Sequence, residues 1–96
     1  MQYTIKAVNP VKQDIKKLNP KAAELIQKHY LAVIKEDPYQ AENLSGKFSS
    51  LKSYHFKYIG VDYRIIYQIF EDEKIIRLLM IGTRENFYKK LKLRLQ

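Results

Sequence analysis

Three basic residues in the second half of the sequence have the spacing to bind an anion: His55, Lys57 and Arg64. Residues 51–59 and 62–71 are rich in tyrosine, isoleucine and phenylalanine, which predicts two strands. Because strand side chains alternate, the three basic residues share one face of this hairpin, and the aromatic and aliphatic residues share the other. We expect helices to cover the apolar face and the basic face to stay open.

The turn between these strands determines which residues lie opposite each other. Residues 60–61 (Gly-Val) can form a two-residue type II′ turn, which places Lys57 directly opposite Arg64. Opposed cations repel by roughly several tenths of a kcal/mol, and an anionic ligand between them would relieve that cost. Alternatively, both side chains extend into solvent, or Asp62 neutralises one of them.

Arg84 and Tyr88 extend this set. A turn at residues 72–73 adds a third strand over 74–83, and Arg84 then emerges beside the first turn. Tyr88 follows Arg84 at the (i, i+4) spacing that puts two residues on one side of a helix. Alternatively, Tyr88 is a core or partner-facing aromatic, although its neighbour Phe87 is the better core candidate.

The rest of the sequence predicts the elements that position these residues. Residues 2–8 alternate as a strand, and Asn-Pro pairs at 9–10 and 19–20 each supply an N-cap and a proline that begin a helix. Two helices joined by almost no loop can pack together over a sheet. A long connection over 37–50 then leads to the strands, and a final helix is expected over 85–95. The predicted fold class is α+β: an N-terminal strand, a helical hairpin, a three-stranded antiparallel meander that completes a four-stranded sheet, and a C-terminal helix.

Composition limits the classes of function. A chain of 96 residues, 46% of them hydrophobic, has room for one domain, which we expect to span residues 1–96. There is no cysteine and there are only two histidines, which argues against disulfides and metal sites. The net charge of +8 favours a polyanionic or acidic partner, although lysine-rich surfaces also occur in ordinary soluble proteins. No signal peptide is visible, and the longest aliphatic run, residues 78–81, is too short to cross a bilayer.

Four short motifs lie between residues 43 and 85: Asn43-Leu-Ser-Gly-Lys47, Tyr54-His-Phe-Lys-Tyr58, Asp62-Tyr-Arg-Ile-Ile-Tyr67 and Ile81-Gly-Thr-Arg-Glu85. Together they resemble the RelE/ParE superfamily of type II toxin–antitoxin toxins. The likeness runs from about residue 43 to 92, and its most specific part is the Asp-Tyr-Arg motif followed by Ile-Gly-x-Arg. The N-terminal strand and helix pair agree with the family in order and length only.

The resemblance implies the same fold and an activity. RelE-type members enter the ribosomal A site and cleave mRNA by attack of a 2′-hydroxyl on the neighbouring phosphate, which leaves a 2′,3′-cyclic phosphate and requires no metal or other cofactor. By this resemblance Arg64 and Arg84 would hold the phosphate, and Lys57 would stabilise charge or transfer a proton. Tyr88 would stack on a base of the mRNA or assist the general base. Five further lysines are expected to bind RNA: Lys47, Lys52, Lys89, Lys90 and Lys92.

The chain departs from the family pattern in three places. His55 stands where RelE carries lysine, although histidine bases occur in relatives, and a histidine that titrates near neutral pH could act as the general base. Thr83 stands where a lysine is common. No histidine occupies the C-terminal helix, as it does in other branches. The acid and base assignments therefore stay open at this point.

The resemblance also implies partners and an alternative. ParE-type toxins share the fold but lack most of the basic set, so the alternative function is inhibition of DNA gyrase without nuclease activity; a degenerate toxin that only binds antitoxin is a third possibility. We expect a cytoplasmic protein with no membrane partner that is monomeric when free and acts on mRNA and rRNA. A cognate antitoxin with an acidic or amphipathic segment would wrap the toxin, covering Arg64 and Arg84 or displacing the C-terminal helix, and fold upon binding into a hetero-oligomer.

Overall fold

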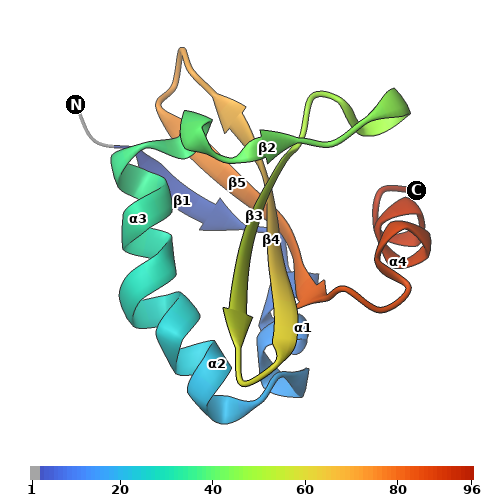
Figure 1. Ribbon diagram of the computed structural model, residues 1–96. Helices are drawn as coiled ribbons and strands as arrows, with labels where there is room; N and C mark the ends of the chain where they lie inside the picture. The colour runs from blue at the N-terminus through green and yellow to red at the C-terminus, as the bar shows by residue number, and fades with distance from the viewer. Residues whose placement is uncertain (1–2) are drawn as a thin grey trace.

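A computed structural model describes residues 3–96, and within them one mixed sheet forms the centre of the molecule (Figure 1). Its strand order is β1-β5-β4-β3-β2, with β1 parallel to β5 and the other neighbours antiparallel. The strands are β1 (Thr4–Ala7), β2 (Glu42–Asn43), β3 (Lys52–Tyr58), β4 (Val61–Phe70) and β5 (Ile75–Thr83). The predicted α+β architecture is confirmed, and the two-residue β2, which lies in the long connection, is an addition to the predicted four strands.

The predicted helical hairpin is also present. Asn19 begins its second helix by accepting hydrogen bonds from the backbone N–H groups of Lys21 and Ala22. This second helix changes to π-helical geometry in its middle before it returns to α-helix. The helical segments are α1 (Pro10–Lys17), α2 (Pro20–Leu25), η1 (Ile26–Tyr30), α3 (Leu31–Glu36) and α4 (Phe87–Arg94), with short 3-10 turns η2 (Pro38–Gln40) and η3 (Gly46–Phe48).

Helices cover both faces of the sheet. Figure 1 shows α2 and α3 on one side of the strands and α4 on the opposite side. The larger core lies under α1 to α3, and a smaller core forms between α4 and the sheet, where Ile66 and Met80 meet Phe87 and Leu91. The prediction that the basic face stays open is therefore wrong for part of that face. Ile66 lies on the same face as Arg64 because their positions differ by two, and an apolar side chain there needs a cover.

The β3–β4 turn differs from the predicted one. Tyr58 pairs with Val61, so the turn residues are Ile59 and Gly60, both with positive φ (47° and 74°), as in a type I′ turn. Consequently Lys57 lies opposite Asp62, and the predicted pairing of Lys57 with Arg64 is wrong. The pairing moves by two residues in all, so each side chain keeps the face assigned to it.

The β4–β5 hairpin contains a bulge that the sequence does not reveal. Phe70 pairs with Ile75 around a four-residue connection, which would place Gly82 opposite Tyr63 if the pairing continued regularly. The register shifts by one between Ile66 and Tyr67, and the additional residue on β5 is Leu79. Gly82 therefore lies opposite Arg64.

Candidate functional site

Basic residues from three neighbouring segments meet on one face of the sheet. Directly opposed residues of neighbouring strands point to the same side, and His55 pairs with Arg64 while Lys57 pairs with Asp62. Arg84 follows the end of β5, and its backbone N–H donates a 3.1 Å hydrogen bond to the carbonyl of Asp62. The structure thus brings together four of the five residues predicted to do chemistry, namely His55, Lys57, Arg64 and Arg84. Asp62, which was not in the predicted set, lies in the same cluster.

Asp62 separates two of these cations. Its Oδ1 lies 3.7 Å from Nζ of Lys57, and its Oδ2 lies 3.9 Å from Nη1 of Arg84. The Lys57 and Arg84 side chains are 68% and 75% exposed, so both pairs are surface ion pairs of small net energy. Of the alternatives left open by the sequence, neutralisation by Asp62 is the one observed for Lys57.

Of the two arginines in this cluster, Arg64 is the one that has no carboxylate partner among the described residues. It is half-buried, its guanidinium carbon lies 4.9 Å from the centre of the Phe87 ring, and its Nε is buried with no hydrogen-bond partner. Across the described residues no ion pair involves Arg64. Gly82, directly opposite, presents no side chain, and a Cβ built there would meet nothing within 4 Å. The guanidinium therefore keeps unused donors beside an open space.

His55 lies next to Arg64 across the strand pair. Desolvation lowers the pKa of His55 below its usual value, and the positive charge of Arg64 lowers it further. The imidazole is exposed to solvent, and the lowered pKa favours its neutral form. A neutral imidazole can accept a proton from a substrate hydroxyl.

Tyr88 lies apart from Arg84. The helix α4 begins only at Phe87, after Asn86 in the left-handed conformation (φ 54°), so Arg84 precedes the helix and the predicted (i, i+4) relation between Arg84 and Tyr88 is wrong. The exposed Tyr88 ring instead stacks near Phe48 of η3, with 6.3 Å between ring centres. Phe48 was not predicted as a site residue, because nothing in the sequence of the 37–50 connection distinguishes it from the other aromatic residue there, Tyr39.

The predicted RNA-binding lysines fall into two groups. The ammonium of Lys52 donates to the backbone carbonyls of Tyr39 (3.3 Å) and Ala41 (3.1 Å) and to Oδ1 of Asn43 (2.8 Å), so it holds the 39–43 segment in place. Because an ammonium has three donors, little of Lys52 is left for RNA. The other four lysines are exposed: Lys47, Lys89, Lys90 and Lys92.

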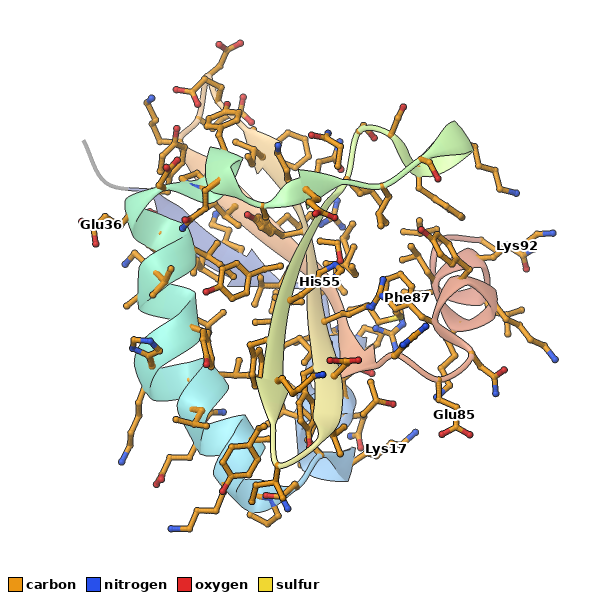
Figure 2. All side chains as sticks on the ribbon, viewed as in Figure 1. Lys17, Glu36, His55, Glu85, Phe87 and Lys92 are labelled. Carbon is orange, nitrogen blue, oxygen red and sulfur yellow. The ribbon has the colours of Figure 1, made fainter. Side chains whose placement is uncertain are left out.

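The exposed lysines belong to η3 and α4, the segments that also carry Phe48 and Tyr88. Nζ of Lys47 lies 5.6 Å from the ring centre of Phe48. Figure 2 shows Phe87 on the side of α4 that faces the sheet and Lys92 on the side that faces away. A groove of about 490 Å³, lined by Asp62, Thr83, Arg84 and neighbouring turn residues, adjoins the basic cluster. The arrangement can bind a phosphate and an adjacent aromatic base.

The histidine and carboxylate side chains of residues 3–96 form no group of three that could hold a metal ion. None of the helices in this part of the chain is both long and apolar enough to span a membrane.

The family model that matches the chain places it among bacterial toxins. Residues 5–92 match the model described as a ParE-like toxin of type II bacterial toxin–antitoxin systems, and the chain therefore belongs to this family. A search of curated protein sequences found no match.

Solved structures show the same fold. The toxin–antitoxin complex RelBE2 from Mycobacterium tuberculosis aligns with a TM-score of 0.77 and 18% identity over 88% of this chain and 100% of the other. A mutant of E. coli toxin RelE in the free state aligns with a TM-score of 0.76 and 20% identity over 100% of both chains. The archaeal RelE–RelB complex from Pyrococcus horikoshii aligns with a TM-score of 0.65 and 21% identity over 88% of this chain and 98% of that one. At these identities the likeness concerns the fold.

Proposed function

We propose that this toxin is a ribosome-dependent endoribonuclease that cleaves mRNA in the A site. One observation carries the proposal: Arg64 is half-buried, stacked on Phe87 and without an ion-pair partner in the described chain, beside an open space and three further polar groups. An unpaired, partly desolvated cation costs free energy that a bound anion returns. A phosphodiester fits the planar guanidinium, which can donate two parallel hydrogen bonds.

The cleavage step uses groups that share the basic face. His55 accepts the proton of the 2′-hydroxyl, and the 2′-oxygen forms a bond to phosphorus as the bond to the 5′-oxygen breaks. Arg64 and Arg84 stabilise the charge of the pentacoordinate phosphate. Lys57 supplies the proton for the leaving 5′-oxygen. The products are a 2′,3′-cyclic phosphate and a 5′-hydroxyl.

The aromatic residues outside this cluster would bind the mRNA rather than cleave it. Tyr88 and Phe48 form an exposed pair at the rim, with Lys47 beside it. Unstacked RNA bases bind aromatic faces, and base–aromatic stacking contributes about 1–3 kcal/mol per base. The exposed lysines of α4 would contact phosphates of mRNA and rRNA, and this activity would be exerted in the cytoplasm.

Primer extension on a translated mRNA tests the proposal. We expect cleavage by the wild type, loss of cleavage in Arg64→Ala and Arg84→Ala, and retained cleavage in Lys35→Ala, which removes an exposed cation of α3 on the opposite side of the sheet from α4. Unchanged cleavage in either cluster variant, or no cleavage by the folded wild type, would overturn it. Tyr88→Leu should lower cleavage without abolishing it, whereas Tyr88→Phe, which keeps the ring, should retain most of it.

The partner in this proposal is a cognate antitoxin. The solved neighbours include RelB–RelE complexes, and the net charge of +8 suits an acidic or amphipathic segment that wraps the chain and covers Arg64 and Arg84. We further propose that residues 1–96 act as one domain, monomeric until the antitoxin binds. Two experiments test this partner. The toxin should co-purify with the protein encoded next to it, and that protein should no longer inhibit the toxin once its acidic residues are neutralised.

A second function is favoured by the family model itself, which bears the ParE name. In that case the toxin would inhibit DNA gyrase and cleave no RNA. A supercoiling assay separates the two functions, because inhibition by purified protein at concentrations that leave translated mRNA intact would support the gyrase target.

A further inference from the structure

The edge of β5 is only partly covered by β1. The two strands pair as far as Ala7 and Leu78, and the last bond runs from the backbone N–H of Val8 to the carbonyl of Leu78. The bulge at Leu79 follows directly. Beyond it, the outward-facing backbone groups of β5 have no strand neighbour on that side, and each needs another hydrogen-bond partner.

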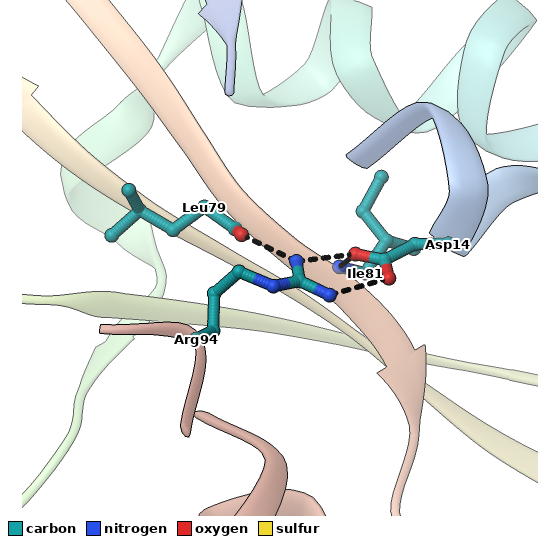
Figure 3. A network of polar contacts seen from close by, with 4 residues as sticks. All are labelled: Asp14, Leu79, Ile81 and Arg94. Atoms are coloured by element: carbon teal, nitrogen blue, oxygen red, sulfur yellow. Dashed lines mark hydrogen bonds and ion pairs between the residues drawn. The ribbon is translucent and has the colours of Figure 1, made fainter. Parts of the chain in front are cut away.

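Two side chains from opposite ends of the sequence satisfy this edge (Figure 3). Asp14 of α1 accepts from the backbone N–H of Ile81 (3.0 Å), and Arg94 of α4 donates to the carbonyl of Leu79 (2.9 Å). Asp14 and Arg94 also bind each other through two hydrogen bonds of 2.8 Å, one to each carboxylate oxygen. Their side chains are 11% and 22% exposed. The pair thus ties α1, β5 and α4 together at one point.

The helix α4 has little else to hold it. It touches the sheet through a narrow stripe of residues spaced four and three apart: Phe87, Leu91 and Arg94. Arg94 lines grooves of about 500 and 470 Å³, the first shared with α1 residues and the second with η3 residues. Leu93, beside it, is 62% exposed. Two buried apolar side chains, one arginine and the exposed Tyr88–Phe48 stack therefore fix the position of this helix.

We propose that the Asp14–Arg94 pair is a latch that keeps α4 docked and so positions Tyr88 and Phe87 at the cleavage site. The pair lies at the far end of α4 from Phe87, and Arg94 is a positioning residue that contacts neither RNA nor the reacting atoms. This inference rests on the proposed nuclease function, because it assigns the latch a role in that reaction. When the latch opens, Arg64 loses its aromatic cover and Tyr88 loses its place opposite Phe48.

Amide hydrogen exchange tests the docking directly and needs no RNA. In Arg94→Ala and Asp14→Asn, we expect the amides of residues 90–94 to exchange about tenfold faster or more, the equivalent of one lost charge-assisted hydrogen bond. Arg94→Lys keeps the charge but loses the two-pronged geometry, and it should show the same local increase. Amides of β3 and β4 should keep their wild-type protection, and Lys35→Ala, on the opposite side of the sheet, should leave α4 unchanged.

Two results of the exchange experiment would overturn the latch. One is wild-type protection of residues 90–94 in the three latch variants. The other is an equal increase in every strand and helix, because the pair would then contribute to global stability alone. If Arg94→Ala fails to fold, Asp14→Asn and Arg94→Lys still decide between these outcomes, since each keeps one polar group at the edge.

A double-mutant cycle tests the link to the reaction. If Arg94 acts by positioning Tyr88, the loss of cleavage caused by Tyr88→Ala in the wild type should disappear in the Arg94→Lys background. Additive losses would show that Arg94 acts independently of Tyr88 and would refute the positioning role. If the wild type cleaves no RNA, the proposed function fails, while the exchange result still reports whether the pair holds α4.

Discussion

Replacement of Asp62 by asparagine should strengthen the binding of RNA. Asp62 occupies the position between Lys57 and Arg84, within 4 Å of both cations, so it competes with any phosphate for them. Asparagine has nearly the same shape and no charge. The backbone carbonyl of residue 62, which accepts from Arg84, is unaffected by the change. The substitution therefore frees two cations without moving the strands that carry them.

The size of the effect follows from charge. A carboxylate and a phosphate about 4 Å apart in a water-like dielectric repel by about 1 kcal/mol, which corresponds to an affinity gain of about fivefold. Each additional phosphate contact with a single strand steepens the plot of log K against log salt by about 0.7. Because Lys57 and Arg84 both become available, the slope should steepen by up to about 1.4.

Fluorescence anisotropy with a 2′-O-methylated single-stranded RNA measures both quantities, because the methyl groups prevent attack and leave binding alone. The matched control is Asp72→Asn, which removes the same charge from the exposed turn at the opposite end of β4. Asp72→Asn should bind with the wild-type slope. Equal slopes for Asp62→Asn and the wild type, or weaker binding by Asp62→Asn, would show that the two cations do not bind phosphate.

Three other substitutions test the site and the turn. His55→Ala should remove the acid limb of the pH–rate profile, because the wild-type rate falls as pH drops through the lowered pKa of His55, below its usual 6.5; an unchanged acid limb would exclude His55 as the base. Gly82→Ala should fold and cleave as the wild type does, because a Cβ at this position meets nothing within 4 Å. Gly82→Leu should keep the wild-type thermal midpoint but lose cleavage, because its side chain fills the space beside Arg64. Full activity of the leucine variant would contradict that placement. Ile59→Asn should raise the free energy of unfolding by about 1 kcal/mol in urea, because a β-branched residue at φ 47° is strained and asparagine is not; a lower value would show that the turn tolerates isoleucine without cost.

The faces of the sheet could be predicted from the sequence, but the pairing of its residues could not. Alternation assigned His55, Lys57 and Arg64 to one face, and that assignment survives because the turn shift moves the pairing by an even number. The turn was misplaced because Ile59 disfavours positive φ, so the local preference pointed to residues 60–61 instead. Here the cross-strand contacts of the observed register, such as the stacking of Phe56 on Tyr63 with 5.1 Å between ring centres, outweigh the preference of one residue.

Other features were hidden because they depend on distant contacts. The apolar residues of β5 run almost without interruption, so alternation cannot reveal the bulge at Leu79. Lys52 looks like an RNA contact until the carbonyls of residues 39 and 41 are seen around it. The cover that α4 provides could have been foreseen, since Ile66 and Met80 fall on the basic face and an apolar residue there requires a partner.

The parallel alignment of β1 with β5 delays the completion of the fold during synthesis. Thr4 lies opposite Ile75, so the first strand finds its neighbour in the sheet only after the last strand has left the ribosome. Contacts between segments this far apart in sequence close late. A ribosome-bound chain that ends at residue 74 should remain sensitive to protease within residues 3–20, and one extended past residue 96 by a linker that brings β5 and α4 out of the exit tunnel should become resistant. Resistance of the shorter chain would show that the N-terminal half folds unaided; sensitivity would mean that each newly made copy completes its fold only once β5 has emerged from the ribosome.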